Sequence, residues 1–443
     1  MLDLFIVVAF QKPQDQTQIT IVVYNGITCI LSKWWVGGNA VNELVLSLMR
    51  YGGCDPEQEI RPLLDKFELE HRCHVRVRMI SWETGRDELV KIALYGKGAD
   101  ISELGTTWCS SFIAMEALRP FTMTELISLG SSSTFFPSSW QSGQLYGEHR
   151  QWAIPWLASI RVLYYRRDLL EKAGVDEKTA FISYSHLLET LNCLQISGIS
   201  TPLALTTKNI PPPILHSLAS WIWGYGGDFV SQDGTHMLFN QMETRAGIHA
   251  FFKLSQFLSP QARGLDPAQA EALFWQGEAA VSLSWQPPIL AAIKKFACPR
   301  VLENLGVTTT PGVTFIGGSN LIIWGHVAPA LENPAVELVR FLTSQQVQST
   351  FNTKIGFFPT RPDVIQKPPF SNDALHPVLM RGLNSGRSFP AITRWAIVED
   401  RMLHMLGQLW EEALSHPYQE MDAIIDEKLE QLSSRLDNLL RIA

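Results

Sequence analysis

A chain of 443 residues is longer than one hydrophobic core normally supports, so its length predicts two or three domains. Hydrophobic residues make up 46% of the chain and charged residues 18%, a balance that describes a folded globular protein and excludes a disordered one. The formal net charge of −7 argues against nucleic-acid binding, which normally needs a basic face. Tryptophan is abundant: several of the 14 residues stand beside Gly or Pro, outside periodic apolar segments, and such flat apolar rings suit a ligand site.

The N-terminal stretch lacks the pattern of an export signal. Residues 4–10 are apolar but few, Asp3 stands where a basic residue is expected, and residues 11–18 are polar. The sequence before Cys29 is a poor lipidation site, and the six cysteines have no framework-like spacing. We therefore predict neither a signal peptide nor a transmembrane helix here.

From Pro56 onward the pattern alternates between helices and strands. Residues 58–71 and 86–95 have the apolar spacing of helices, whereas 75–80 and 99–104 are typical of strands. Such alternation predicts a parallel α/β sheet, whose ligands lie beyond the carboxyl ends of the strands.

The stretch 152–165 is aromatic, β-branched and poor in turn residues, which predicts a long strand interrupted at Pro155. A short helix at 169–173 follows, and Gly174 occupies the position of a left-handed cap. The strand carries large or polar groups that a core strand would not need: Trp156, Ser159 and Arg161.

The rest of the chain continues the same alternation. Helices are predicted at 184–194, 214–223, 243–257, 268–276, 334–342 and 418–440, and strands at 201–205 and 307–311. The Gly-rich segment 221–228 matches no phosphate-binding pattern, because no Lys follows it. His71, Cys73 and His74 lack the spacing of a zinc site, so we expect no metal there.

The order and spacing of these motifs resemble the extracellular solute-binding proteins of bacterial ABC importers, in particular the sugar-binding family that includes maltose-binding protein. In the first half the resemblance is carried by Phe67, Glu68, Glu70, His71, Trp82, Leu89, Gly96, Ala99, Asp100 and Trp108. The long strand shares Leu163, Tyr165, Asp168 and Leu169, with Arg166-Arg167 where Asn-Lys is usual. Later segments of the same kind are 277–285, 317–324 and 356–361, so the resemblance runs from about Pro56 to the C-terminus.

This resemblance implies an α/β protein with the two-lobed, type II periplasmic-binding-protein-like fold, in which several crossing segments join the lobes around a ligand cleft. We expect residues 1–154 and 314–344 in the first lobe. Residues 155–313 and 345–443, with a helical C-terminal region, are expected in the second. Lobes of this kind close on a solute by a hinge motion.

The same resemblance implies the substrate-binding protein of an ABC-type importer, which binds a sugar or oligosaccharide and delivers it to permease subunits in the membrane. It further implies a periplasmic or extracellular monomer, associated with the membrane through the transporter, without cofactor, metal or nucleic acid. The expected stacking faces are Trp108, Trp156, Trp221 and Trp285, of which Trp285 is the strongest candidate. The expected hydrogen-bonding groups are Thr107, Ser159, Arg161 and Asn320.

Other interpretations stay open. The tryptophans are also explained by packing: Trp108 on a helix at 112–118, and Trp285 against Pro287-Pro288. A solute sensor without a permease fits the missing export signal. A carbohydrate-active enzyme would need two facing carboxylates, and only Asp228 and Glu278 stand near these motifs, so we expect no catalysis. Polyamine binding needs an acidic cleft and iron binding needs clustered Tyr or carboxylates, and neither pattern is present.

Overall fold

The computed structural model describes residues 5–11, 17–25, 28–36, 42–51, 54–208, 213–231, 234–284 and 293–441. Its first three strands pair antiparallel in a sheet of their own: β1 (Phe5–Gln11), β2 (Thr17–Asn25) and β3 (Thr28–Val36). Among the described helices, none combines the length and the apolar character that a membrane span requires.

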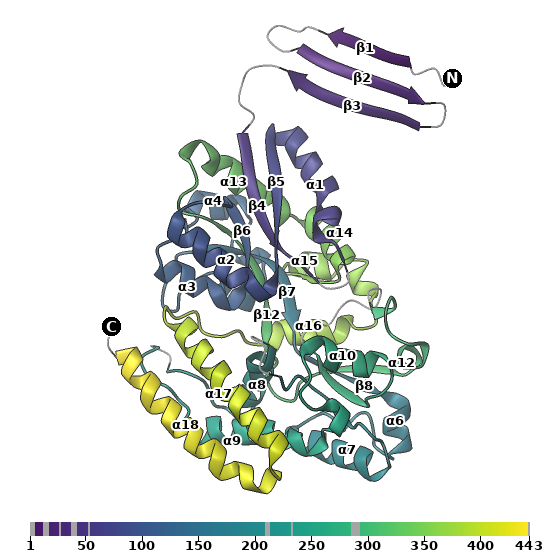
Figure 1. Ribbon diagram of the computed structural model, residues 1–443, viewed down its shortest axis with the longest axis vertical. Coiled ribbons are helices and arrows are strands. Elements are labelled where there is room, and N and C mark those ends of the chain that lie inside the picture. Colours follow the sequence, from purple (N-terminus) through teal and green to yellow (C-terminus); the bar gives the residue numbers. More distant parts are fainter. Residues whose placement is uncertain are drawn as a thin grey trace.

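The first lobe is built on a six-stranded sheet with the order β13-β7-β12-β6-β4-β5. Its strands are β4 (Asn42–Met49), β5 (Cys73–Ile80), β6 (Ile101–Gly105), β7 (Ala153–Ile160), β12 (Ile316–Ile323) and β13 (Phe358–Pro359). Strand β4 runs parallel to β5 and β6, whereas β12 runs antiparallel to β6 and β7. The helices of this lobe are α1 (Pro56–His71), α2 (Trp82–Tyr95), α3 (Cys109–Ala114), α4 (Met123–Ser128), α5 (Pro137–Gln141), α13 (Pro329–Leu342) and α14 (Gln345–Ile355) (Figure 1).

Helix α1 illustrates how local sequence sets these elements. The Asp55 side chain caps its first turn by accepting a hydrogen bond from the backbone N–H of Glu57. Pro56 begins the helix, at a position where the N–H that proline lacks would have no partner within the helix. Its core-facing side is buried at intervals of three and four residues: Ile60, Leu64 and Phe67. The same pattern was the basis for predicting a helix at 58–71.

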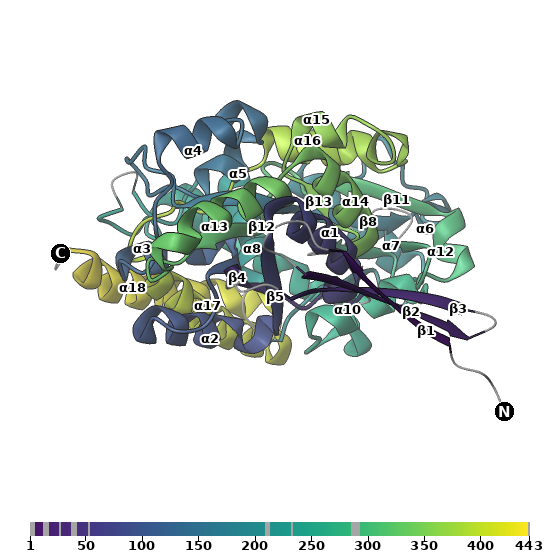
Figure 2. The same cartoon turned by 90° about the horizontal axis from the view of Figure 1, so that it is seen from above.

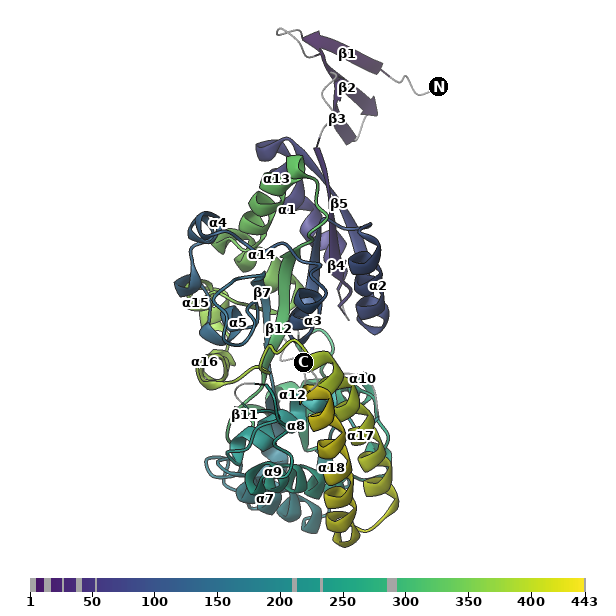
Figure 3. The ribbon, with the colours of Figure 1, turned by 90° about the vertical axis from the view of Figure 1, so that its left-hand side faces the viewer.

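The second lobe has a four-stranded sheet with the order β11-β8-β10-β9. Its strands are β8 (Val162–Arg166), β9 (Leu203–Ala204), β10 (Val281–Ser284) and β11 (Leu305–Thr309). The helices around it are α6 (Arg167–Lys172), α7 (Tyr184–Ile196), α8 (Pro213–Gly224), α9 (Met242–Phe252), α10 (Pro267–Trp275), α12 (Pro299–Glu303), α17 (Trp395–Ser415) and α18 (Tyr418–Arg441). Helix α17 packs on α8 and α18 packs on α9, so the C-terminal helices cover this lobe (Figures 1 and 3).

Two elements that we expected in the second lobe lie in the first, and so does most of β7, from Pro155 to Ile160. Helix α14 packs against α1 and buries Val347 and Phe351 in the first-lobe core, and β13 pairs with β7. The first lobe therefore extends beyond residue 344. Helices α15 (Pro362–Ile365) and α16 (His376–Ser385) follow, on the opposite side of the molecule from α2 and α17 (Figure 2).

The long strand predicted at 152–165 breaks at a different residue. Pro155 lies inside β7, and the chain leaves the ladder only at Arg161, between β7 and β8. Proline cannot donate to a ladder, and the register shifts beside it. Ser319 pairs with Leu157 and Asn320 with Pro155, so Trp156 of β7 is passed over.

Three crossing segments run side by side between the lobes. The Arg161 N–H donates to the Phe315 carbonyl at 3.1 Å, and the Arg387 N–H donates to the Thr314 carbonyl at 3.0 Å. The Ile316 N–H in turn donates to the Arg387 carbonyl at 2.7 Å. This narrow, three-stranded connection is the place where the lobes can rotate against each other.

Candidate functional site

Four aromatic side chains, Phe357, Tyr51, Trp82 and Trp108, form a row in the first lobe, which we call the aromatic row. Tyr51, Trp82 and Trp108 follow the carboxyl ends of the parallel strands β4, β5 and β6, where α/β proteins bind ligands. Ring centroids are 4.7 Å apart for Tyr51 and Phe357, 6.5 Å for Tyr51 and Trp82, and 5.4 Å for Trp82 and Trp108.

The row is closely packed but not sealed. Tyr51 and Trp108 are each 7% exposed, and Trp82 is half-buried. Gly105 lets both indoles approach the end of β6, since a Cβ there would lie 3.4 Å from Trp82 and 3.5 Å from Trp108. The strand end therefore carries a flat apolar surface of limited exposure.

A buried carboxyl group holds Tyr51 in place. The Tyr51 hydroxyl donates to Glu103 Oε1, and the Met49 N–H donates to Glu103 Oε2 at 2.8 Å. Burial raises the pKa of Glu103 to about 7 and the pKa of Tyr51 well above its ordinary value. The carboxyl group thus fixes the loop after β4 at the end of the aromatic row.

A second buried acid meets the row from the C-terminal helices. Glu399 on α17 is 2% exposed, and α17 contacts both α3 and the short helix Thr106–Trp108. Burial raises the pKa of Glu399 to about 7, while the positive charge of Arg86 and a hydrogen bond from Thr107 act against that rise. Glu399 stands in an ordinary helical stretch without a motif, so nothing in the sequence singles it out.

Of the expected ligand-binding residues, Thr107 and Trp108 lie at this site. Ser159, half-buried in β7, pairs with Gly317 on the neighbouring crossing strand. The adjacent Gly318, with φ of +128°, permits close contact with β7, since a Cβ there would lie 1.9 Å from the Leu157 carbonyl oxygen. Trp285 lies outside the described residues.

Three other expected residues are buried within the lobes and present no free face. Trp156 stacks on Phe351 with ring centroids 5.3 Å apart. Trp221 meets Phe251 edge to face at 5.3 Å. The Asn320 amide donates to the Ser142 hydroxyl at 3.0 Å. In this structure these side chains act as core residues.

Arg161 lies in the hinge instead of beside the aromatic row. Its guanidinium approaches His216 Nδ1 at 2.8 Å and covers the Phe315 ring at 5.6 Å. His216 itself stacks on Phe315 at 4.1 Å. Burial lowers the pKa of Arg161 to about 9, and burial beside that cation lowers the pKa of His216 well below its ordinary value. The imidazole is therefore neutral and accepts a hydrogen bond from arginine.

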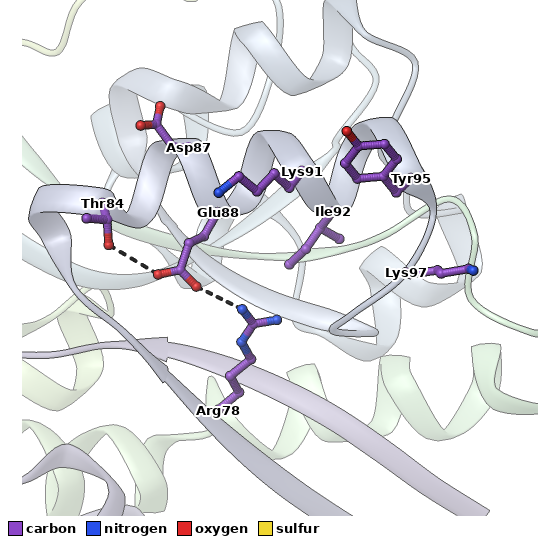
Figure 4. Close-up of a pocket in the computed structure, with 8 residues that line it drawn as sticks. All are labelled: Arg78, Thr84, Asp87, Glu88, Lys91, Ile92, Tyr95 and Lys97. Atoms are coloured by element: carbon purple, nitrogen blue, oxygen red, sulfur yellow. Dashed lines mark hydrogen bonds and ion pairs between the residues drawn. The ribbon is translucent and has the colours of Figure 1, made fainter.

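Two surface hollows lie elsewhere on the first lobe. One of about 710 Å³ extends along α2 and β5, where Glu88 accepts hydrogen bonds from Thr84 at 3.1 Å and Arg78 at 2.8 Å (Figure 4). Another of about 580 Å³ lies between α3 and the loop that carries Trp152. The first is lined mainly by charged side chains of one helix face, which is unlike the apolar base of a sugar site. Within the described ranges, no three His, Cys, Asp or Glu residues gather as a metal site would require.

Comparisons with known proteins agree with this architecture. The family profile for bacterial extracellular solute-binding proteins matches residues 63–378. The diacetylchitobiose binding protein DasA of Streptomyces coelicolor is 23% identical over 365 residues, which cover 79% of this chain and 80% of that protein.

Solved structures confirm the expected two-lobed α/β fold. The sugar-binding protein MalE from Xanthomonas citri matches with a TM-score of 0.75 at 18% identity, covering 91% of this chain and 100% of that one. MalE3 of T. maritima matches with a TM-score of 0.72 at 22% identity, covering 88% and 99%. The profile match over most of its length shows that this chain belongs to the family of bacterial extracellular solute-binding proteins.

Proposed function

We propose that the protein is the substrate-binding component of an ABC-type importer and binds a sugar or oligosaccharide at the aromatic row, between its two lobes. The observation that carries the proposal is the position of Tyr51, Trp82 and Trp108 at the carboxyl edge of the parallel strands. Aromatic faces with a few polar groups at their rim suit sugar rings, and Thr107 and Ser159 supply hydroxyl groups nearby.

The names of the relatives support this class of solute. DasA is named for diacetylchitobiose, and the MalE3 structure contains maltose. Family membership supports a periplasmic or extracellular location and delivery to membrane permease subunits. A monomer is the simplest form for such delivery. The family consists of binding proteins, which supports a function without catalysis.

Sugar binding is tested by thermal unfolding in the presence of maltose, diacetylchitobiose and longer oligosaccharides of each kind. A sugar at a hundredfold over Kd should add about 2.7 kcal/mol to the free energy of unfolding. Trp82→Leu should remove the stabilisation, because leucine keeps apolar packing but offers no flat face. Tyr95→Leu, at the exposed far end of the same helix, is the matched control and should retain it.

Trp285→Ala extends the experiment to the residue that the sequence favours most. Loss of the sugar effect would assign Trp285 to the binding site. If no sugar stabilises the wild-type protein, the solute belongs to another class. Recovery of cleaved sugar after prolonged incubation would instead establish an enzyme.

A further inference from the structure

Glu399 occupies a buried position where an acid with only a structural role would destabilise the fold. It is nearly fully buried, yet its Oε1 has no hydrogen-bond partner among the described residues. A buried polar atom without a partner destabilises a protein, and more so when it is charged. Glu103, the other buried acid in the described part of the chain, is satisfied by Tyr51 and Met49.

The unpartnered atom of Glu399 lies close to the aromatic row. Helix α17 packs on α8 of the second lobe and also contacts the short helix Thr106–Trp108 of the first. Glu399 thus lies where the C-terminal helices meet the end of β6, beside Thr107 and the aromatic row. The charged groups that act on it are Arg86 on α2 and Asp400 on α17 itself. Within the described part of the chain, no Arg, Lys or His forms an ion pair with Glu399.

We propose that Glu399 is a ligand-binding residue whose Oε1 accepts a hydrogen bond from a hydroxyl group of the sugar bound at the aromatic row. This inference rests on the proposed function and names the acid that completes its site. Thr107 from the first lobe and Glu399 from α17 then hold the same sugar, so binding joins the two lobes. A hydroxyl donor favours the ionised carboxylate, so sugar binding near pH 7 releases a fraction of a proton.

The test is calorimetric titration of the full-length protein with maltose and with diacetylchitobiose, at pH 7, in two buffers of different ionisation enthalpy. The buffer difference measures the protons released on binding. Wild-type protein should release protons. Glu399→Gln should abolish the release and weaken binding by about ten- to a hundredfold, the range for a hydrogen bond to a charged group. Glu411→Gln, at an exposed acid farther along α17, should keep both the affinity and the release.

The outcomes separate this inference from the proposed function. Wild-type protein that binds neither these sugars nor their longer forms contradicts the proposed function, and the inference falls with it. Binding with unchanged affinity and unchanged proton release in Glu399→Gln overturns the inference alone and leaves sugar binding intact. Because burial also raises the pKa of Glu103 to about 7, loss of the release in Glu103→Gln but not in Glu399→Gln overturns it too. If Glu399→Gln does not fold, the wild-type protein still tests the inference. Sugar binding by the wild type without any proton release would contradict the role of Glu399.

Discussion

Single residues explain why this site is difficult to read from the sequence. Trp156 and Trp221 look like stacking faces because they are aromatic and near turns, but both point into cores. A strand or helix that is buried on every side has no polar face, so its pattern does not reveal which ring reaches solvent. Trp82 and Tyr51, in contrast, are placed by the strand ends that they follow. Their closeness to each other becomes visible only when β4, β5 and β6 are aligned in one sheet.

Glu103 gives a prediction at the scale of one carboxyl group. Its folded pKa of about 7 lies above the ordinary value of 4.5, so the folded protein keeps a proton that the unfolded chain loses. The stability contributed by this group is therefore lost as pH rises from about 4.5 to 7, by roughly 3 kcal/mol. The side chain of Glu103→Gln cannot ionise, so this variant should not lose that stability. Its free energy of unfolding should therefore rise relative to that of the wild type as pH increases over this range.

Urea unfolding at pH 5 and pH 7.5 measures the effect. Glu125→Gln is the control with the opposite sign: its hydrogen bonds with Arg119 and Thr122 lower the pKa of Glu125 against the effect of burial. That variant should lose stability relative to the wild type most at neutral pH and least in acid. An equal difference between Glu103→Gln and the wild type at both pH values would show that this carboxyl group ionises normally.

At the scale of elements, the sequence predicts most where one face of a helix or strand is buried. The helix at 58–71 and the strands at 75–80 and 99–104 follow from periodicity and appear in the structure as α1, β5 and β6. The break at Pro155 was misplaced, because one extra residue of β7 shifts the register beside the proline and the strand continues to Ile160. The assignment of α14 and β13 failed for a related reason: only tertiary pairing with α1 and β7 reveals their lobe. No sequence motif marks Glu399, because its closeness to the aromatic row follows only from the tertiary contacts of α17.

The pairing of β7 with β12 supports a prediction about Gly318. Its φ of +128° is unfavourable for other residues, and a Cβ would lie 1.9 Å from the Leu157 carbonyl oxygen. Gly318→Ala should therefore lower the free energy of unfolding by about 3 kcal/mol or more. Gly174→Ala, with φ of +68° and no atom within 4 Å of the added Cβ, should lower it by only about 1 kcal/mol. Denaturant titration of both variants gives the comparison, and equal losses would contradict the close packing of the two crossing strands.

At the scale of the whole molecule, the hinge is small and the lobes are large. Backbone hydrogen bonds link the three crossing segments, and Arg161, His216 and Phe315 fill the space beside them. A ligand that touches both lobes shifts their relative orientation only through contacts that differ between the open and closed forms. Such contacts are absent from a sequence pattern, which explains why the two lobes were predictable and the groups that bridge them were not.

Cys54 offers a direct measure of lobe closure. This free cysteine of the first lobe is half-buried, and burial and Glu59 raise its pKa, whereas the charge of Lys295 in the second lobe acts to lower it. The charge of Lys295 therefore acts on Cys54 from the second lobe. If sugar binding closes the hinge, Lys295 and its loop will cover Cys54 further, and maleimide should react with Cys54 more slowly when maltose or diacetylchitobiose is bound.

Peptide mapping by mass spectrometry follows the rate of this reaction. Cys193 on α7, away from the hinge, provides the internal control with an unchanged rate. Equal slowing at both cysteines would indicate general stabilisation, and no slowing at Cys54 with a sugar that binds would show that binding occurs without closure.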